Sequence, residues 1–417
     1  MPFLPPHFVN LEKTNHLLNP TSMLFDLPNA EEIIQKACAF AAQSGITTGA
    51  IAKLRKEYPG IAPEILSYAF ELADGTLHAQ KSGKFLEEYS QWLFTRQTYE
   101  QSTSSLIAAH HAKRFQGANH ILEICTGAGI DTAELSRRAP VTTIEMDAQI
   151  HALAARNFLV GKCSSITQKR GRAEDILPHL TERFDALWAD PSRRETHGKR
   201  MSVSADDYQP PLNWVMNLQV TGVQGIKISP AITFERLPPG WVQEWIGSKH
   251  ECKEQILWKN TDVTNGTVTL VESGISWVPK QKREAEILEL QNAKYLAEPH
   301  PALIRSGYLG EFYRENSLKV FDRSIAYGVS TQAPEMSEFL TAFSVIESFP
   351  FNTKQLQQRL NELNWNKETE IKKRGFPELP DEVRKRLKFA QTGERGVIFL
   401  TQAQGKKMVI LAERVKK

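Results

Sequence analysis

The sequence predicts an α/β fold: a doubly wound, mostly parallel sheet with a terminal antiparallel hairpin, flanked by a helical N-terminal domain and a C-terminal α+β domain. Between about residues 100 and 278, short apolar runs such as HILEI and VTTIE alternate with helical segments. Strands that alternate with helices form parallel sheets through right-handed crossovers. At the end of this stretch, only NTDVTNG separates the strand-like runs CKEQILWK and TVTLVESG. This linker is too short for a helix, so we expect an antiparallel hairpin.

The patterns place three domains along the chain. Apolar residues at three- and four-residue spacing predict helices over 30–45, 62–75 and 83–94. Glycines stand where helices of this kind commonly end, at Gly45, Gly60 and Gly75. After residue 280, helices are expected over 355–365 and 381–390, and strands over 395–402 and 406–414, the last two joined by a hairpin turn at AQGK. We therefore assign 1–97 to the helical domain, 98–280 to the α/β domain and 281–417 to the α+β domain.

Composition limits the class of protein. The chain has 417 residues, of which 41% are hydrophobic and 24% are charged, a balance typical of soluble globular proteins. Its four cysteines are scattered without zinc-ligand or redox spacing, which predicts reduced thiols and no metal site. Neither a signal peptide nor an apolar run of membrane-spanning length occurs. We expect a cytoplasmic protein that does not enter the membrane.

Positive charge is concentrated near the C-terminus. Residues 371–417 hold 13 Lys/Arg against 5 Asp/Glu, whereas the whole chain has a net charge of +3. A basic end can bind a polyanion such as RNA, or it can be a solvated lysine-rich tail. The candidate RNA contacts are Lys372, Lys373, Arg374, Arg384 and Arg386. Phe376 or Phe389 could stack on a base, or both could belong to the core.

A glycine turn after the first predicted strand of the α/β domain predicts a nucleotide-like ligand. In HILEICTGAGIDT, Gly127 and Gly129 allow the backbone to approach a ligand beside a helix N-terminus. A dinucleotide site would continue with a third glycine, but Thr132 occupies that position. Glu145 ends the second strand, where a carboxylate can accept both hydroxyls of a ribose. The expected ligand has a ribose and an anionic end but no diphosphate.

S-adenosylmethionine meets these requirements, and the segment resembles the class I S-adenosylmethionine-dependent methyltransferases. Their first motif, an acid followed by a G-x-G turn, is matched by Glu123, Gly127 and Gly129, and their second by Glu145. The resemblance implies a seven-stranded Rossmann-like sheet. The candidate cofactor residues are Glu123, Cys125, Thr126, Gly127, Gly129, Asp131, Thr132, Glu145, Met146, Ala173, Glu174 and Asp190. In the third motif, the turn after the third strand, Arg172 replaces the usual acid. An alternative interpretation stays open, in which EICTGAG is only a tight turn in another kind of α/β protein.

The fourth predicted strand ends in WADPSRR, which supplies the candidate catalytic residues Asp190, Pro191, Arg193 and Arg194. Ligands of doubly wound sheets bind outside the carboxyl ends of the strands. There Asp190 can orient or deprotonate an incoming N–H or O–H, and Pro191 fixes the turn. The two arginines can hold a phosphate or carboxylate of the substrate, or pair with Asp206 or Asp207. Lys227 is either functional or the partner of a carboxylate.

The stretch DPSRRETHGKRMSVSADDYQPPLNWV resembles a bacterial group of methyltransferases with a C-terminal THUMP-like domain. The similarity continues through IKISPAI, YLAEPHPALIRSGYLGE and EIKKRGFPELPDEVRKRLK. It implies a methyltransferase that acts on structured RNA, either tRNA or rRNA. Two alternatives stay open: a methyltransferase of small molecules or proteins, and a non-catalytic RNA-binding protein with a relic cofactor site.

Overall fold

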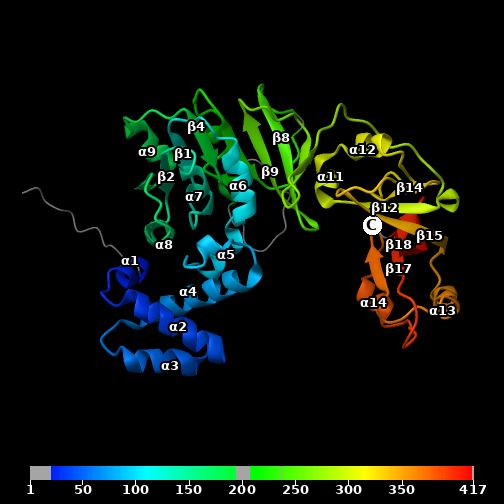
Figure 1. The fold of residues 1–417 in the computed structure, drawn as a ribbon, viewed down its shortest axis with the longest axis horizontal. Helices are drawn as coiled ribbons and strands as arrows, with labels where there is room; N and C mark the ends of the chain where they lie inside the picture. Colours follow the sequence, from blue (N-terminus) through cyan, green and yellow to red (C-terminus); the bar gives the residue numbers. More distant parts are fainter. Residues whose placement is uncertain (1–19, 194–206, 235, 416–417) are drawn as a thin grey trace, which may run out of the picture. The chain divides into compact units, whose positions relative to one another are not determined.

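The structure is a computed structural model that describes residues 20–193, 207–234 and 236–415 (Figure 1). The contacts between residues divide the chain into two compact units, Met1–Trp188 and Ala189–Lys417. The first unit holds the N-terminal helices and the glycine turn. The second unit holds the antiparallel strands and the C-terminal module.

Four helices open the first unit and share one apolar core. They are α1 (Pro20–Phe25), α2 (Ala30–Ser44), α3 (Thr48–Glu57) and α4 (Pro63–Ser82). Ile33, Leu54 and Leu72 are completely buried in this core, which also contains Leu153 of α8 (Ala148–Val160). The helices thus pack against the α/β part of the same unit. The remaining helices of the unit are α5 (Arg96–Gln101), α6 (Ser105–Lys113), α7 (Ile130–Ser136) and α9 (Ala173–Ile176).

The predicted helices in this region are partly wrong. The first prediction matches α2, with Gly45 as its C-cap. Helix α4, however, continues through Gly75 to Ser82, and an ideal Cβ at Gly75 would overlap the carbonyl oxygen of Phe94. Gly75 therefore serves close packing rather than helix termination. Residues 83–94 contain only a short 3₁₀ turn, because their apolar side chains fill a core with α6 and α7 from an irregular backbone.

The larger sheet differs from the predicted one. Within the described residues it has nine strands in the order β11-β10-β8-β9-β7-β4-β1-β2-β3, and it is mixed rather than seven-stranded and mostly parallel. Strands β1, β2 and β3 pair in parallel, as expected. The strands are β1 (Ile121–Ile124), β2 (Val141–Glu145), β3 (Ile166–Arg170), β4 (Ala186–Ala189), β7 (Gln224–Ile228), β8 (Trp241–Ser248), β9 (Glu251–Lys259), β10 (Thr267–Leu270) and β11 (Ile275–Trp277).

The predicted hairpin between the last two runs is wrong. Strand β9 pairs antiparallel with β8, and β10 lies on the other side of β8 and runs parallel to it. The prediction overlooked β8 because WVQEWIGS has a carboxylate in its middle. Glu244 is completely buried, and it accepts hydrogen bonds from Trp258 Nε1 at 2.8 Å and Thr269 Oγ1 at 2.6 Å. An antiparallel hairpin does occur, but it is formed by β8 and β9.

The C-terminal module is built on a second sheet with the order β13-β14-β12-β15-β18-β17-β16. Its strands are β12 (Tyr295–Pro299), β13 (Lys319–Val320), β14 (Gly328–Ser330), β15 (Leu340–Pro350), β16 (Glu370–Lys373), β17 (Val397–Ala403) and β18 (Lys406–Arg414). The helices of this part are α11 (Pro301–Ser306), α12 (Leu309–Glu315), α13 (Thr353–Glu362) and α14 (Pro380–Arg384). The predicted β17–β18 hairpin is confirmed. The helix expected over 381–390 ends at Arg384, because Leu387 and Phe389 turn into the core under α13 and α14.

No helix in the described parts of the chain is long and apolar enough to cross a membrane.

The packing at Gly75 yields a stability prediction. Gly75→Ala places a methyl group against the backbone at Phe94, so we expect the free energy of unfolding to fall by about 1–3 kcal/mol. Gly49→Ala in α3 is the matched control, because its Cβ meets nothing closer than Thr47 Oγ1 at 3.8 Å. The control should leave stability unchanged or raise it by up to about 1 kcal/mol. Urea denaturation followed by tryptophan fluorescence measures both, and equal midpoints for the two variants would contradict the packing argument.

Candidate cofactor and catalytic site

The turn between β1 and α7 has a backbone that leaves space for a ligand. Cys125, Gly127 and Gly129 all have positive φ, at 70°, 57° and 96°. A side chain would have different effects at Gly129 and at Gly127. A Cβ at Gly129 would overlap the Phe158 ring, whereas a Cβ at Gly127 would meet nothing within 4 Å. Gly129 therefore packs the turn onto α8, and Gly127 keeps an open approach to its backbone.

Glu145 joins this turn to the end of β2. Its side chain accepts hydrogen bonds from the backbone N–H of Gly127 at 3.2 Å and of Asp147 at 2.9 Å. Burial raises the pKa of the carboxyl, and the backbone hydrogen bonds oppose that shift. A carboxylate has about four acceptor positions, so Glu145 can also accept from ribose hydroxyls. The predicted pair of Gly127 and Glu145 is thus brought together in one place.

Other predicted cofactor residues hold the turn from behind. Glu123, 1% exposed, accepts a hydrogen bond from Thr132 Oγ1 at 2.5 Å. Asp131 lies 3.0 Å from Nδ1 of the buried His111, which sequence reasoning did not select. Thr126 Oγ1 contacts Thr143 Oγ1 at 2.5 Å. These side chains bind other protein groups and so fix the backbone conformation that a ligand would meet.

The remaining predicted cofactor residues of the first unit come directly after strands β2 and β3 in the sequence. Met146 is 54% exposed although it is apolar, and it directly follows Glu145. After β3, the N–H of Gly171 donates to the backbone oxygen of Glu145 at 2.9 Å, which brings the segment with Ala173 toward the end of β2. Ala173 is buried, and the side chain of Glu174 pairs with Arg172 at 3.0 Å. Arg172, which stands where the predicted third motif would have an acid, therefore pairs with the nearby acid.

A charge cluster surrounds the predicted catalytic acid in the second unit. Lys227 Nζ of β7 lies 2.7 Å from Asp190 Oδ2 and 3.8 Å from Glu254 Oε2 of β9. The question about Lys227 is thus answered in part, since it does pair with a carboxylate. Pro191 is buried. The neighbouring strand β5 (Ser192–Arg193) pairs with β6 (Tyr208–Gln209), ahead of α10 (Leu212–Met216).

The predicted arginine pair lies largely beyond what the structure describes. The backbone of Arg193 pairs with Tyr208, but its side chain, all of Arg194 and the alternative partner Asp206 are outside the described residues.

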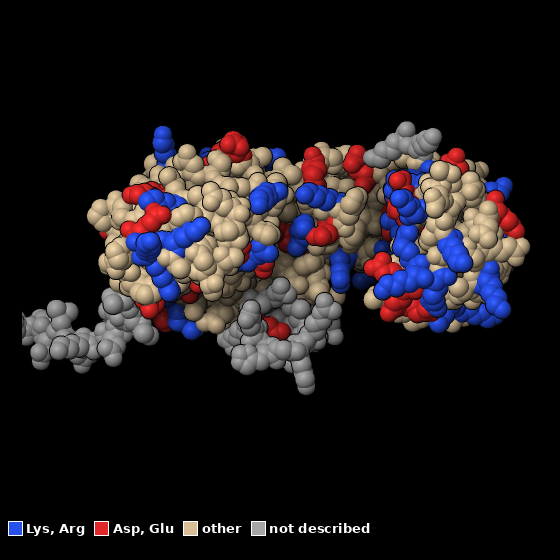
Figure 2. Space-filling model, turned by 90° about the horizontal axis from the view of Figure 1, so that it is seen from below, with Lys and Arg blue, Asp and Glu red and all other residues tan. Residues whose placement is uncertain are grey.

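Lys and Arg side chains stand among Asp and Glu side chains on the surface of the C-terminal module (Figure 2). The predicted RNA contacts differ in whether they already bind other groups of the protein. Lys372 pairs with Glu298 at 2.6 Å, and Arg386 pairs with Glu378. Arg384 donates to the backbone oxygens of Lys367 and Thr369. Arg374 lies over the Tyr327 ring, and Lys373 is exposed. Lys385 and Lys388 of the same predicted basic segment are exposed as well. Further exposed cations of this module, which sequence reasoning did not select, include Arg395, Lys406, Lys407 and Arg414.

The phenylalanines proposed for base stacking both pack in the core. Phe376 is 4% exposed, and Phe389 packs against the same cluster under the guanidinium of Arg384. Phe376 is thus buried, and Phe389, which is partly exposed, has one ring face covered by Arg384. Binding through the basic segment would therefore depend mainly on charge.

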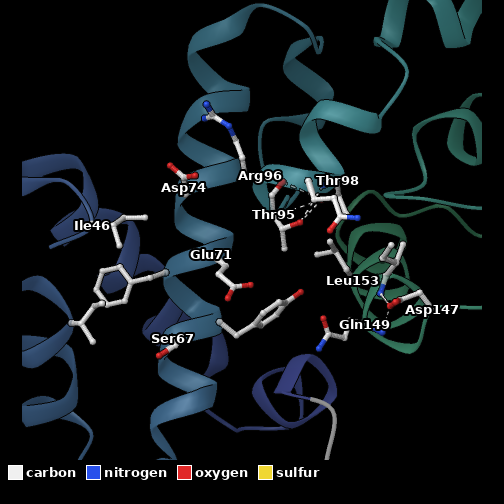
Figure 3. A pocket seen from close by; sticks show the side chains of 15 residues that line it. Ile46, Ser67, Glu71, Asp74, Thr95, Arg96, Thr98, Asp147, Gln149 and Leu153 are labelled. Atoms are coloured by element: carbon white, nitrogen blue, oxygen red, sulfur yellow. Dashed lines mark hydrogen bonds between the residues drawn. The ribbon is translucent and has the colours of Figure 1, made fainter. Parts of the chain in front are cut away.

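A separate cavity of about 520 Å³ lies in the first unit, between α4 and the start of α8 (Figure 3). Glu71 and Asp74 line it from α4, and Arg96, Asp147 and Gln149 line it from α5 and the region of α8. It contains none of the predicted cofactor residues, so we do not assign the cofactor to it. In the described residues, no cluster of three or more His, Cys, Asp or Glu could hold a metal ion.

Comparisons with known proteins bear on the C-terminal module and on the fold of the chain. Residues 340–414 match the family model described as THUMP domain-like. A curated protein of Mycobacterium tuberculosis (strain CDC 1551 / Oshkosh), named as an uncharacterized S-adenosylmethionine-dependent methyltransferase, is 26% identical over 322 residues, which cover 74% of this chain and 85% of the relative. The crystal structure of a candidate methyltransferase from Porphyromonas gingivalis W83 has a TM-score of 0.73 at 20% identity, covers 93% of this chain and 99% of its own, and thereby shows the shared fold.

The contacts of Glu145 yield a binding prediction. Glu145→Gln removes a charged acceptor, so we expect affinity for the predicted cofactor, S-adenosylmethionine, to fall roughly 10–100-fold. Because burial raises the pKa of Glu145, protonation begins at higher pH than for an ordinary glutamate. As pH falls, the affinity of the wild type should therefore start to decrease at a higher pH than an unperturbed glutamate would cause, and that of the variant should stay flat.

Isothermal titration calorimetry measures both effects. Glu182→Gln, at an exposed position in the loop before β4, is the control and should bind like the wild type. Equal affinity of Glu145→Gln and wild type at neutral pH would show that the carboxylate does not hold the ribose.

Proposed function

We propose that this chain, an S-adenosylmethionine-dependent methyltransferase, transfers a methyl group to structured RNA, either tRNA or rRNA. The observation that carries the cofactor assignment is the hydrogen bond from Gly127 to the buried Glu145 beside an open glycine turn. The THUMP-like residues 340–414 and the basic C-terminal segment support an RNA substrate.

The residues of the turn suit the parts of S-adenosylmethionine. Glu145 would accept the ribose hydroxyls, and the backbone at Gly127 would approach the methionine part. Met146, exposed beside Glu145, offers an apolar contact for the adenine ring, with the backbone at Ala173 on the next strand end. When bound, the cofactor supplies an activated methyl group on a sulfonium.

Asp190 would act on the nucleophile. Methyl transfer is an in-line displacement, for which alignment of the reacting groups contributes roughly 7–11 kcal/mol. A substrate N–H or O–H that donates to Asp190 is held in one direction, and the carboxylate can also take its proton. The turn at Pro191 would keep the carboxylate at the end of β4.

The C-terminal module would dock the RNA through phosphate contacts. The family model covers only 340–414, but β12 pairs with β15 across residues 295–299, so the sheet begins well before residue 340. This pairing supports our boundary near residue 281 for the docking domain. Exposed cations such as Lys373 and Lys385 provide affinity without sequence readout.

One experiment tests the whole proposal. Nucleosides from total RNA of a deletion strain and its parent are compared by mass spectrometry. We expect one methylated nucleoside to disappear on deletion, to return with the wild-type gene, and to stay absent with Asp190→Asn, which should still bind the cofactor. Identical nucleoside profiles, together with methyl transfer to a protein or small molecule, would replace RNA with one of those substrates. Absence of cofactor binding by the wild type would favour the non-catalytic alternative.

The docking proposal has a quantitative test. If Lys373 and Lys385 contact phosphates, the double variant Lys373→Gln/Lys385→Gln should weaken RNA binding for all sequences and reduce the slope of log affinity against log salt by about 2. Lys53→Gln/Lys56→Gln, two exposed lysines of α3, is the control with the same change in charge. Filter binding of bulk RNA over a salt series measures the slopes. Equal slopes for the two double variants would exclude these lysines as contacts.

A further inference from the structure

Lys227 links the predicted catalytic acid to a second, more deeply buried acid. Its ammonium lies 2.7 Å from Asp190 Oδ2 and 3.8 Å from Glu254 Oε2. The exposed fraction of the side chains decreases from 31% at Asp190 to 16% at Lys227 and 5% at Glu254. The three charges therefore form a row that runs from the surface into the protein, with Asp190 at its outer end.

The backbone that carries Lys227 is fixed from two sides. In the β7–β9 pairing, Lys227 lies opposite Ile256, both strands being part of the sheet. Two residues further on, the N–H of Ser229 donates to the hydroxyl of the buried Tyr208 at 2.8 Å. A lysine on such a rigid element can hold a neighbouring group in a defined direction.

Asp190 and Glu254 together stabilise the charged form of Lys227. A partly buried ammonium is costly without nearby carboxylates, and a carboxylate as buried as Glu254 is costly without a cation. Glu254 therefore favours the charged form of Lys227 from the inner side, where water has little access. The charged ammonium in turn favours the ionised form of Asp190 and fixes one of its two oxygens.

We propose that Lys227 is a positioning residue that holds the Asp190 carboxylate ionised and oriented, with Glu254 keeping Lys227 charged. The inference rests on the proposed function, in which Asp190 acts on the nucleophile. It also refines the role of Asp190. A carboxylate next to an ammonium is a weaker base, so Asp190 acts chiefly as a hydrogen-bond acceptor that directs the substrate N–H or O–H, and the proton is released to water once the methyl group has moved from sulfur to the substrate atom.

Activity measurements provide the first test. Methyl transfer from tritiated S-adenosylmethionine to total RNA of the deletion strain is compared for wild type, Lys227→Met and Lys227→Arg. We expect Lys227→Met to lower kcat roughly 10–100-fold with KM for the cofactor within about threefold, and Lys227→Arg to restore part of the rate. Lys253→Met is the control, because Lys253 is an exposed lysine on β9 that pairs with Glu251. An unchanged kcat in folded Lys227→Met would overturn the proposal.

Carbon-13 NMR of protein labelled at the aspartate carboxyls provides a test that needs no RNA. The signal of Asp190 is assigned by its loss in Asp190→Asn. Among the residues that the structure describes, the titratable groups of this cluster include Lys227 and Glu254, and the Tyr208 hydroxyl binds the nearby backbone. Without the ammonium, the titration midpoint of Asp190 should rise by about 1–3 pH units.

The activity assay and the NMR titration distinguish a failure of the proposed RNA substrate from a failure of the role proposed for Lys227. If the wild type does not methylate RNA, the proposed substrate fails, whereas the NMR titration still decides whether Lys227 controls Asp190. An unchanged midpoint in Lys227→Met would overturn the inference even if RNA is the substrate. Lys227→Gln gives the same readouts should Lys227→Met fail to fold.

Discussion

The contact on which the candidate site depends is the one between the Glu145 carboxylate and the backbone amides of Gly127 and Asp147. It ties the glycine turn after β1 to the end of β2 and to the start of α8. A carboxylate this buried is stable only while it accepts hydrogen bonds, so the turn and the acid fix each other. Phe158 of α8, which fills the space beside Gly129, holds the same turn from the other side. The conformation of the turn is therefore fixed by contacts within the protein itself.

In the second unit, too, the acidic side chains are held by hydrogen bonds or ion pairs with other protein groups. Asp190, Lys227 and Glu254 form a chain of charges at the strand ends, and Glu244 is satisfied by donors from β9 and β10. Glu254 and Glu244 each have a partner on a neighbouring strand. The charges at strand ends are thus oriented by rigid elements, which suits a reaction in which alignment is the main contribution of the protein.

Prediction from the sequence succeeded where the signal is local. The glycine turn, the acid at the end of β2, the parallel order of β1–β3 and the β17–β18 hairpin all follow from spacing within about 20 residues. Prediction from the sequence failed where contacts with residues far away in the chain determine the secondary structure. Strand β8 was overlooked because Glu244 is satisfied by Trp258 and Thr269, and helix α4 continues because Gly75 packs on Phe94. The pairing of Lys227 with Asp190 spans 37 residues, so no local pattern could select it over other carboxylates.

The central claim is that the turn at Gly127 and the Glu145 carboxylate bind S-adenosylmethionine, and a crystal structure with its product, S-adenosylhomocysteine, tests it most directly. The account predicts that both ribose hydroxyls lie within hydrogen-bonding distance of the Glu145 carboxylate and that the amino-acid part lies against the backbone of Gly127. A ligand bound elsewhere, for example in the cavity lined by Glu71 and Asp147, would contradict it, as would a Glu145 side chain turned away from the ribose.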